Sequence, residues 1–167
     1  MTSAATTANY IGAFGAPANT GVSDKAGIAK QNFKRVIGHY TQTSSGQKLA
    51  DLYNGLIEVF KDYSESNWDG YGARPISRDA FVEGQRIIDL LSGSPLPLPE
   101  ILPESGGEIA FEWRNRDRVF VASVKGNQTI EYAGVFGKYP GTHGLELFAE
   151  SIPATIVANI NRVFTGI

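Results

Sequence analysis

Residues Glu108 to Phe136 read E-I-A-F-E-W-R-N-R-D-R-V-F-V-A-S-V-K-G-N-Q-T-I-E-Y-A-G-V-F, and their pattern indicates the fold class. Apolar and polar side chains alternate in three segments of this stretch, residues 108–115, 118–125 and 128–136. A period of two is typical of a strand with one buried face. The links between these segments are short and polar, and successive strands joined by short links pair antiparallel. The sequence therefore predicts a three-stranded antiparallel meander.

Amphipathic helix patterns flank the predicted strands. The clearest covers residues 47–63, where apolar side chains recur at three and four residues. Others cover residues 28–40, 78–91 and 153–164. Ser77 is a natural N-cap for the helix at 78–91, because its hydroxyl oxygen can accept a free helix N–H.

The remaining segments predict no regular secondary structure. Residues 1–27 are rich in Ala, Thr, Gly and Asn and indicate a flexible N-terminal arm. Residues 94–104 hold four prolines, which favour a stiff extended connector, and residues 137–144 indicate a loop. We therefore expect an α+β fold in which N-terminal helices precede the meander and a C-terminal helix follows it. The helices are expected to pack on one face of the sheet, with residues 28–167 forming a single domain.

Composition narrows the classes of function. The chain has 167 residues, 42% of them hydrophobic, which suits one domain with or without a tail. Its formal net charge of −2 argues against the uniformly basic surface that binding to a phosphate backbone usually requires. No cysteine is present, so there is no thiolate nucleophile and no cysteine-based metal site. We find no signal peptide pattern and no apolar run of membrane-spanning length, and expect a cytoplasmic protein without a membrane partner.

A dense loop motif, N-W-D-G-Y-G-A-R-P-I-S at residues 67–77, lies between two predicted helices. We interpret six of its residues as a structural corner in which the aromatic ring fills the join and the aspartate accepts backbone N–H groups: Trp68, Asp69, Gly70, Gly72, Pro75 and Ser77. Its tyrosine and arginine have the composition of a binding hot spot. The candidate partner-binding residues are therefore Tyr71 and Arg74, together with the basic residues of the strand turns, Arg114, Arg116, Arg118 and Lys125.

No reaction centre is evident in the sequence. Glu108, Glu112 and Arg114 share one side of a predicted strand, which is compatible with acid–base chemistry. Alternation alone produces such a row on an ordinary solvated sheet face, and this is the interpretation we favour. His39 and His143 have no neighbouring ligands at metal spacing, and phosphate-loop and dinucleotide fingerprints are missing. We therefore expect no catalytic residue, no metal and no cofactor.

Three motifs resemble those of a widespread group of small uncharacterised bacterial and phage-borne proteins. They are W-D-G-Y-G-A-x-P-I-S at residues 68–77, G-E-I-x-F-E-W-R at 107–114 and I-x-Y-A-G at 130–134. The group has no established activity, so the resemblance carries over no catalytic role. It implies a shared α+β fold and a setting of mobile elements or defence conflict.

The expected function is that of a non-catalytic protein-binding module. With the resemblance, the form we expect is a phage or mobile-element inhibitor of a host defence complex, similar to an anti-CRISPR protein and acting in the host cytoplasm. Three alternatives stay open: an antitoxin-like or immunity-like partner, a small enzyme or ligand binder using Glu108, Glu112 and Arg114, and a nucleic-acid binder using the strand-turn arginines.

Overall fold

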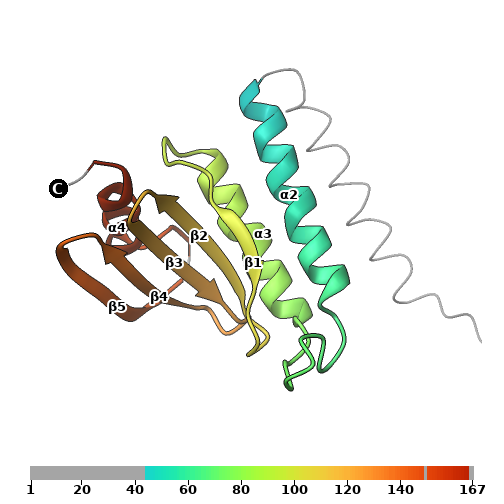
Figure 1. Ribbon diagram of the computed structural model, residues 1–167. Coiled ribbons are helices and arrows are strands. Elements are labelled where there is room, and N and C mark those ends of the chain that lie inside the picture. Colours follow the sequence, from blue (N-terminus) through green and yellow to red (C-terminus); the bar gives the residue numbers. More distant parts are fainter. Residues whose placement is uncertain (1–43, 149, 166–167) are drawn as a thin grey trace, which may run out of the picture. The chain divides into compact units, whose positions relative to one another are not determined.

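A computed structural model describes residues 44–148 and 150–165, and Figure 1 shows their arrangement. The elements in chain order are α2 (Ser44–Asp62), α3 (Arg78–Ser92), β1 (Glu100–Pro103), β2 (Ile109–Asn115), β3 (Arg118–Val124), β4 (Thr129–Phe136), β5 (Tyr139–Leu147) and α4 (Ala154–Thr165). The predicted arm at residues 1–27 and the predicted helix at 28–40 lie outside the described residues.

The sheet has five strands in the order β1-β2-β3-β4-β5, and every neighbouring pair is antiparallel. The predicted α+β fold with an antiparallel sheet is confirmed, but the prediction of three strands is wrong. The predicted strands correspond to β2, β3 and β4. The two additional strands, β1 and β5, form the edges of the sheet.

The two edge strands were not predicted because they contain proline and glycine, which usually indicate loops. In β1, Pro103 pairs with Ile109, and an edge strand tolerates proline because one of its sides needs no N–H donor. In β5, Gly144 pairs with Tyr132, and a Cβ atom at Gly144 would lie 2.6 Å from the Tyr132 hydroxyl. Gly144 therefore leaves space for the Tyr132 side chain within a strand. The sequence pattern had indicated a loop at residues 137–144.

The helices contact one face of the sheet. Helix α3 contacts β2 and β3, and α4 contacts β2, β3 and β4. The buried aromatic and aliphatic side chains on this face, which form much of the core, are Ile109, Phe111, Trp113, Phe120, Val124, Ile130 and Phe136. Near the C-terminal end of α4, the Arg162 guanidinium lies 3.8 Å from the centroid of the Phe136 ring.

Helix α2 packs against α3 and β1. Leu56 of α2 is fully buried, and its side chain lies about 3.0 Å from the position that a Cβ atom would take at Gly84 of α3. Further along the pair, the Phe60 and Phe81 rings pack with their centroids 4.6 Å apart. This close approach of α2 and α3 fixes the end of each helix next to the loop at residues 67–77.

The α2–α3 contact gives the first prediction. Leu56→Ala should lower the free energy of unfolding by about 2–5 kcal/mol, because it leaves a cavity at a fully buried position. Ile57→Ala, one residue away and only partly buried, should lower it by less than half as much. Chemical denaturation of both variants measures the difference, and equal losses would contradict this packing.

Candidate binding surface

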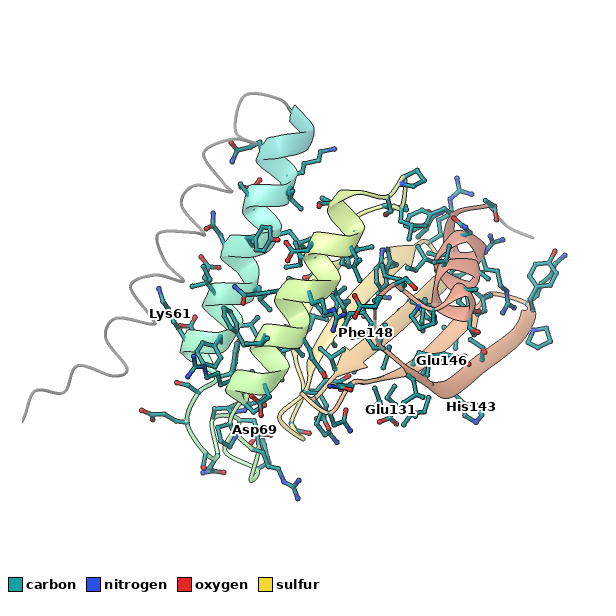
Figure 2. All side chains as sticks on the ribbon, turned by 180° about the vertical axis from the view of Figure 1, so that it is seen from behind. Lys61, Asp69, Glu131, His143, Glu146 and Phe148 are labelled. Atoms are coloured by element: carbon teal, nitrogen blue, oxygen red, sulfur yellow. The ribbon has the colours of Figure 1, made fainter. Side chains whose placement is uncertain are left out.

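The face of the sheet opposite the helices is covered by none of the described elements. We call it the open face and define it by twelve residues of four strands: Ala110, Glu112 and Arg114 (β2), Val119, Val121 and Ser123 (β3), Glu131, Ala133 and Val135 (β4), and His143, Leu145 and Leu147 (β5). These side chains share a face because they alternate with the buried ones along each strand. Figure 2 labels two of them, Glu131 and His143, on neighbouring strands.

Large aliphatic side chains are exposed on the open face. Val135 is 57% exposed, Leu145 62% and Leu147 77%, and they belong to the adjacent strands β4 and β5. An antiparallel sheet with one solvated face normally carries polar residues there. Large aliphatic residues exposed on one sheet face are characteristic of a surface that contacts another molecule.

A depression of about 840 Å³ occupies one end of the open face. The turn at residues 104–108 forms one side of it, and Glu131, His143 and Leu145 are among the residues on the other side. In it, the Ser123 hydroxyl donates a hydrogen bond of 3.0 Å to Oε1 of Glu104. Burial raises the pKa of the Glu104 carboxyl above its ordinary value, and the hydrogen bond from Ser123 opposes that shift.

The depression does not unite the residues predicted for the enzyme alternative. Glu112 pairs with Arg114 at 2.8 Å outside the depression, whereas Glu108 lines it and pairs with Lys125 at 2.5 Å. The hydrogen bond and charge of Glu108 raise the pKa of the Lys125 ammonium. Among the described residues, no group of three or more His, Asp or Glu side chains is placed to hold a metal ion.

The sequence reasoning missed Glu104, the carboxyl in the depression whose pKa is shifted. Glu100, Leu102 and Glu104 are spaced by two residues, which is the period of a strand. The prolines of the connector obscured this pattern, because they favour an irregular extended segment. Once residues 100–103 are recognised as a strand, these three side chains fall on the same face as Ala110 and Glu112. The exposed Leu145 and Leu147 were missed for a related reason, since β5 was interpreted mainly as a loop.

The loop at residues 67–77 is held by its own polar groups. Oδ1 of Asp69 accepts hydrogen bonds from the backbone N–H groups of Tyr71 at 2.7 Å and Ala73 at 3.0 Å, and these bonds lower the pKa of the Asp69 carboxyl. Nε1 of Trp68 donates to the Arg74 carbonyl at 2.9 Å. The loop therefore closes on itself, and it leaves the Tyr71 side chain 95% exposed.

The remaining corner residues connect this loop to the helices and the sheet. Gly107 has a φ of +91°, and a Cβ atom there would lie 2.9 Å from the Pro75 carbonyl oxygen. The Ser77 hydroxyl accepts a hydrogen bond of 3.0 Å from the Ala80 N–H and so caps α3. Gly70 and Gly72 both have positive φ values, which L side chains rarely adopt.

The structure divides the predicted partner-binding residues between opposite ends of the sheet. Arg114 and Arg116 belong to the β2–β3 hairpin, and the nearby Arg118 guanidinium donates to the Arg162 carbonyl of α4. Lys125 directly follows the other end of β3, near the turn at residues 104–108. The Arg74 N–H donates to the Ser105 carbonyl of that turn at 2.8 Å. The six residues therefore do not form one basic patch.

Comparison with protein-family models, with curated proteins and with solved structures gives no match for this chain. Among the described helices, none is long and apolar enough to cross a membrane.

The shifted Glu104 carboxyl gives a pH-dependent prediction. The unfolded chain releases this proton near the ordinary value of 4.5, whereas the folded chain holds it to higher pH. Between the two pKa values the unfolded state binds fewer protons, so the free energy of unfolding falls as pH rises. Glu104→Gln keeps an acceptor for Ser123 but cannot ionise, so the free energy of unfolding of this variant should rise relative to that of the wild type as pH increases above 4.5. Denaturant titrations at a series of pH values measure the difference, and a pH-independent difference would refute the assignment.

The Asp69 hydrogen bonds give a prediction for the loop. Asp69→Ala removes the acceptor of two backbone N–H groups, so the Tyr71 and Ala73 amides should exchange with solvent faster than in the wild type. Amide exchange measured by NMR tests this. Glu65→Ala, at an exposed position just before the loop, is the matched control and should leave both rates unchanged. Unaltered exchange in Asp69→Ala would show that other contacts hold the loop.

Proposed function

We propose that this protein is a non-catalytic protein-binding module that docks its partner on the open face. The observation that carries the proposal is the exposure of Val135, Leu145 and Leu147 on two adjacent strands of a face that no described helix covers. Burying such side chains against a partner removes apolar surface from water, which is the main driving force of most protein association.

The surroundings of the aliphatic residues indicate the chemistry of the partner. Glu131 is exposed beside Leu145, and Glu104 and Glu108 lie further along the same end of the open face. A partner surface that carries apolar side chains together with lysine or arginine residues would complement this pattern. Tyr71, fully displayed by a loop that is closed by hydrogen bonds, is a candidate second anchor because little conformational freedom of its backbone is lost on binding.

The same charges weigh against the nucleic-acid alternative. Carboxylates at Glu112, Glu131 and along the depression would oppose a phosphate backbone laid across the open face. The arginines of the β2–β3 hairpin are separated from Lys125 by the length of β3. Three of the four basic residues already pair with a carboxylate or a helix carbonyl close by. The geometry therefore favours a protein partner.

The narrower form of the proposal concerns the kind of partner. The motifs at residues 68–77, 107–114 and 130–134 resemble those of small phage-borne proteins. On that support we propose inhibition of a host defence complex in the host cytoplasm, in the manner of an anti-CRISPR protein. An antitoxin-like or immunity-like role would use the same open face with a different partner.

A pair of matched variants tests the docking surface. Val135→Lys places a charge on the open face at one of its exposed aliphatic positions, whereas Val82→Lys places the same charge on α3 at a position of similar exposure, 52% against 57%. With the full chain as bait in a lysate of the native host, Val135→Lys should reduce the recovered partner by about 10-fold or more, and Val82→Lys should not. Equal recovery with both variants would exclude the open face as the docking surface.

A further inference from the structure

The outer edge of β5 differs from the other edge of the sheet. Strand β1 has four residues, ends in Pro103 and is contacted by α2. Strand β5 has nine residues, and the helix contact described on it lies near its start, where the Arg162 guanidinium of α4 donates to the Pro140 carbonyl at 3.1 Å. Its proline and the irregularity in its pairing with β4 are both confined to its first half, which leaves Thr142–Leu147 regular. Long regular edge strands are templates for pairing with another chain, and proteins normally shorten, bend or cover them.

The pairing of β4 with β5 shows which backbone groups face outward. The Phe148 N–H donates to the Gln128 carbonyl at 2.8 Å, which identifies this pair as hydrogen-bonded. In an antiparallel ladder hydrogen-bonded pairs alternate with pairs that are not, so Glu146 and Gly144 also turn their backbone groups toward β4. The N–H and C=O groups of Leu147, Leu145 and His143 therefore point away from the sheet.

The side chains of the same three residues lie on the open face. A strand added to this edge would place its own side chains directly opposite them and on that face. The two most exposed aliphatic residues of the sheet, Leu145 and Leu147, are thus positioned to pack across the new strand pair. The outer edge of β5 therefore offers both outward-facing backbone groups and apolar side chains to an added strand.

We propose that the strand added at this edge is β5 of a second copy of the chain, paired antiparallel about a two-fold axis at Leu145. In that register Leu145 faces Leu145 of the second copy, and His143 faces Leu147. On the other side of the sheet, Glu146 faces Gly144, which has no side chain to oppose it. A two-fold axis at Glu146 would instead set two carboxylates directly opposite each other, which is destabilising.

The pairing is closed because the same segment serves both copies. It joins two five-stranded sheets into one continuous sheet and places both open faces on the same side, with the helices on the other. This inference goes beyond the proposed function and does not depend on it, because it needs no second kind of protein.

Sedimentation equilibrium on the full chain tests the proposal through a charge-swap experiment. The wild type should have twice the 18.0 kDa mass of one chain. Leu145→Lys and Leu145→Glu each place like charges opposite each other at the two-fold axis, and each should raise the dimer dissociation constant by about 30-fold or more. Mixing the two variants should restore the dimer, because the lysine of one then faces the glutamate of the other.

Val135→Lys is the matched control, since it puts the same charge on β4, one strand away from the edge, and should remain dimeric. This variant also separates the two proposals, because it should lose the partner while keeping the dimer. A monomeric wild type, a dimer that persists in Leu145→Lys, or a mixture of the charge variants that stays monomeric would overturn the proposal.

Amide exchange gives a second measurement that requires no variant. In the wild type the outward N–H groups of His143, Leu145 and Leu147 should be protected at concentrations where the dimer forms and should lose that protection on dilution. Fast exchange of all three amides at high protein concentration would also overturn the proposal.

Discussion

Helices α3 and α4 bury one face of the sheet, and this burial determines which side chains each strand exposes. Phe111 and Phe120 are fully buried on that face, and α3 approaches closely at Gly84. Because strands alternate, fixing these side chains inward also fixes Val135 and Leu145 outward. The exposure of the open face is thus a consequence of the packing beneath the helices. A slip of one residue in any strand would exchange the two faces.

Polar contacts at one end of the molecule hold the sheet in this position relative to α3. The Glu83 carboxylate of α3 accepts hydrogen bonds from the backbone N–H groups of Gly126 and Gln128 in the β3–β4 turn. The Ser77 cap begins the same helix next to the loop at residues 67–77. These contacts place the loop, the Glu104 turn and the depression at a common end of the sheet, while the open edge of β5 runs along one side.

Much of the fold follows from the periodicity of the sequence, and the exceptions have identifiable causes. The alternation in residues 108–136 predicted β2, β3 and β4, and the helical spacing of apolar residues predicted α2, α3 and α4. Pro103 concealed β1, and Gly141 and Gly144 concealed β5, because these residue types usually mark loops. The candidate site was harder to predict, since Glu104 and Leu145 belong to those two missed strands. The separation of Lys125 from the hairpin arginines could have been deduced, because consecutive turns of a meander lie at opposite ends of the shared strand.

The docking proposal requires the open face to be accessible in the complete chain. Thiol labelling measures this accessibility, because the sequence contains no cysteine. Single-cysteine variants at Val135 and at the buried Ala122 compare the two faces of the sheet. The cysteine at 135 in the native full chain should react nearly as fast as that of an unstructured peptide. The cysteine at 122 should react only when denaturant unfolds the chain. A cysteine at 135 that is protected in the native chain would contradict the docking proposal, because another part of the molecule would then cover this face.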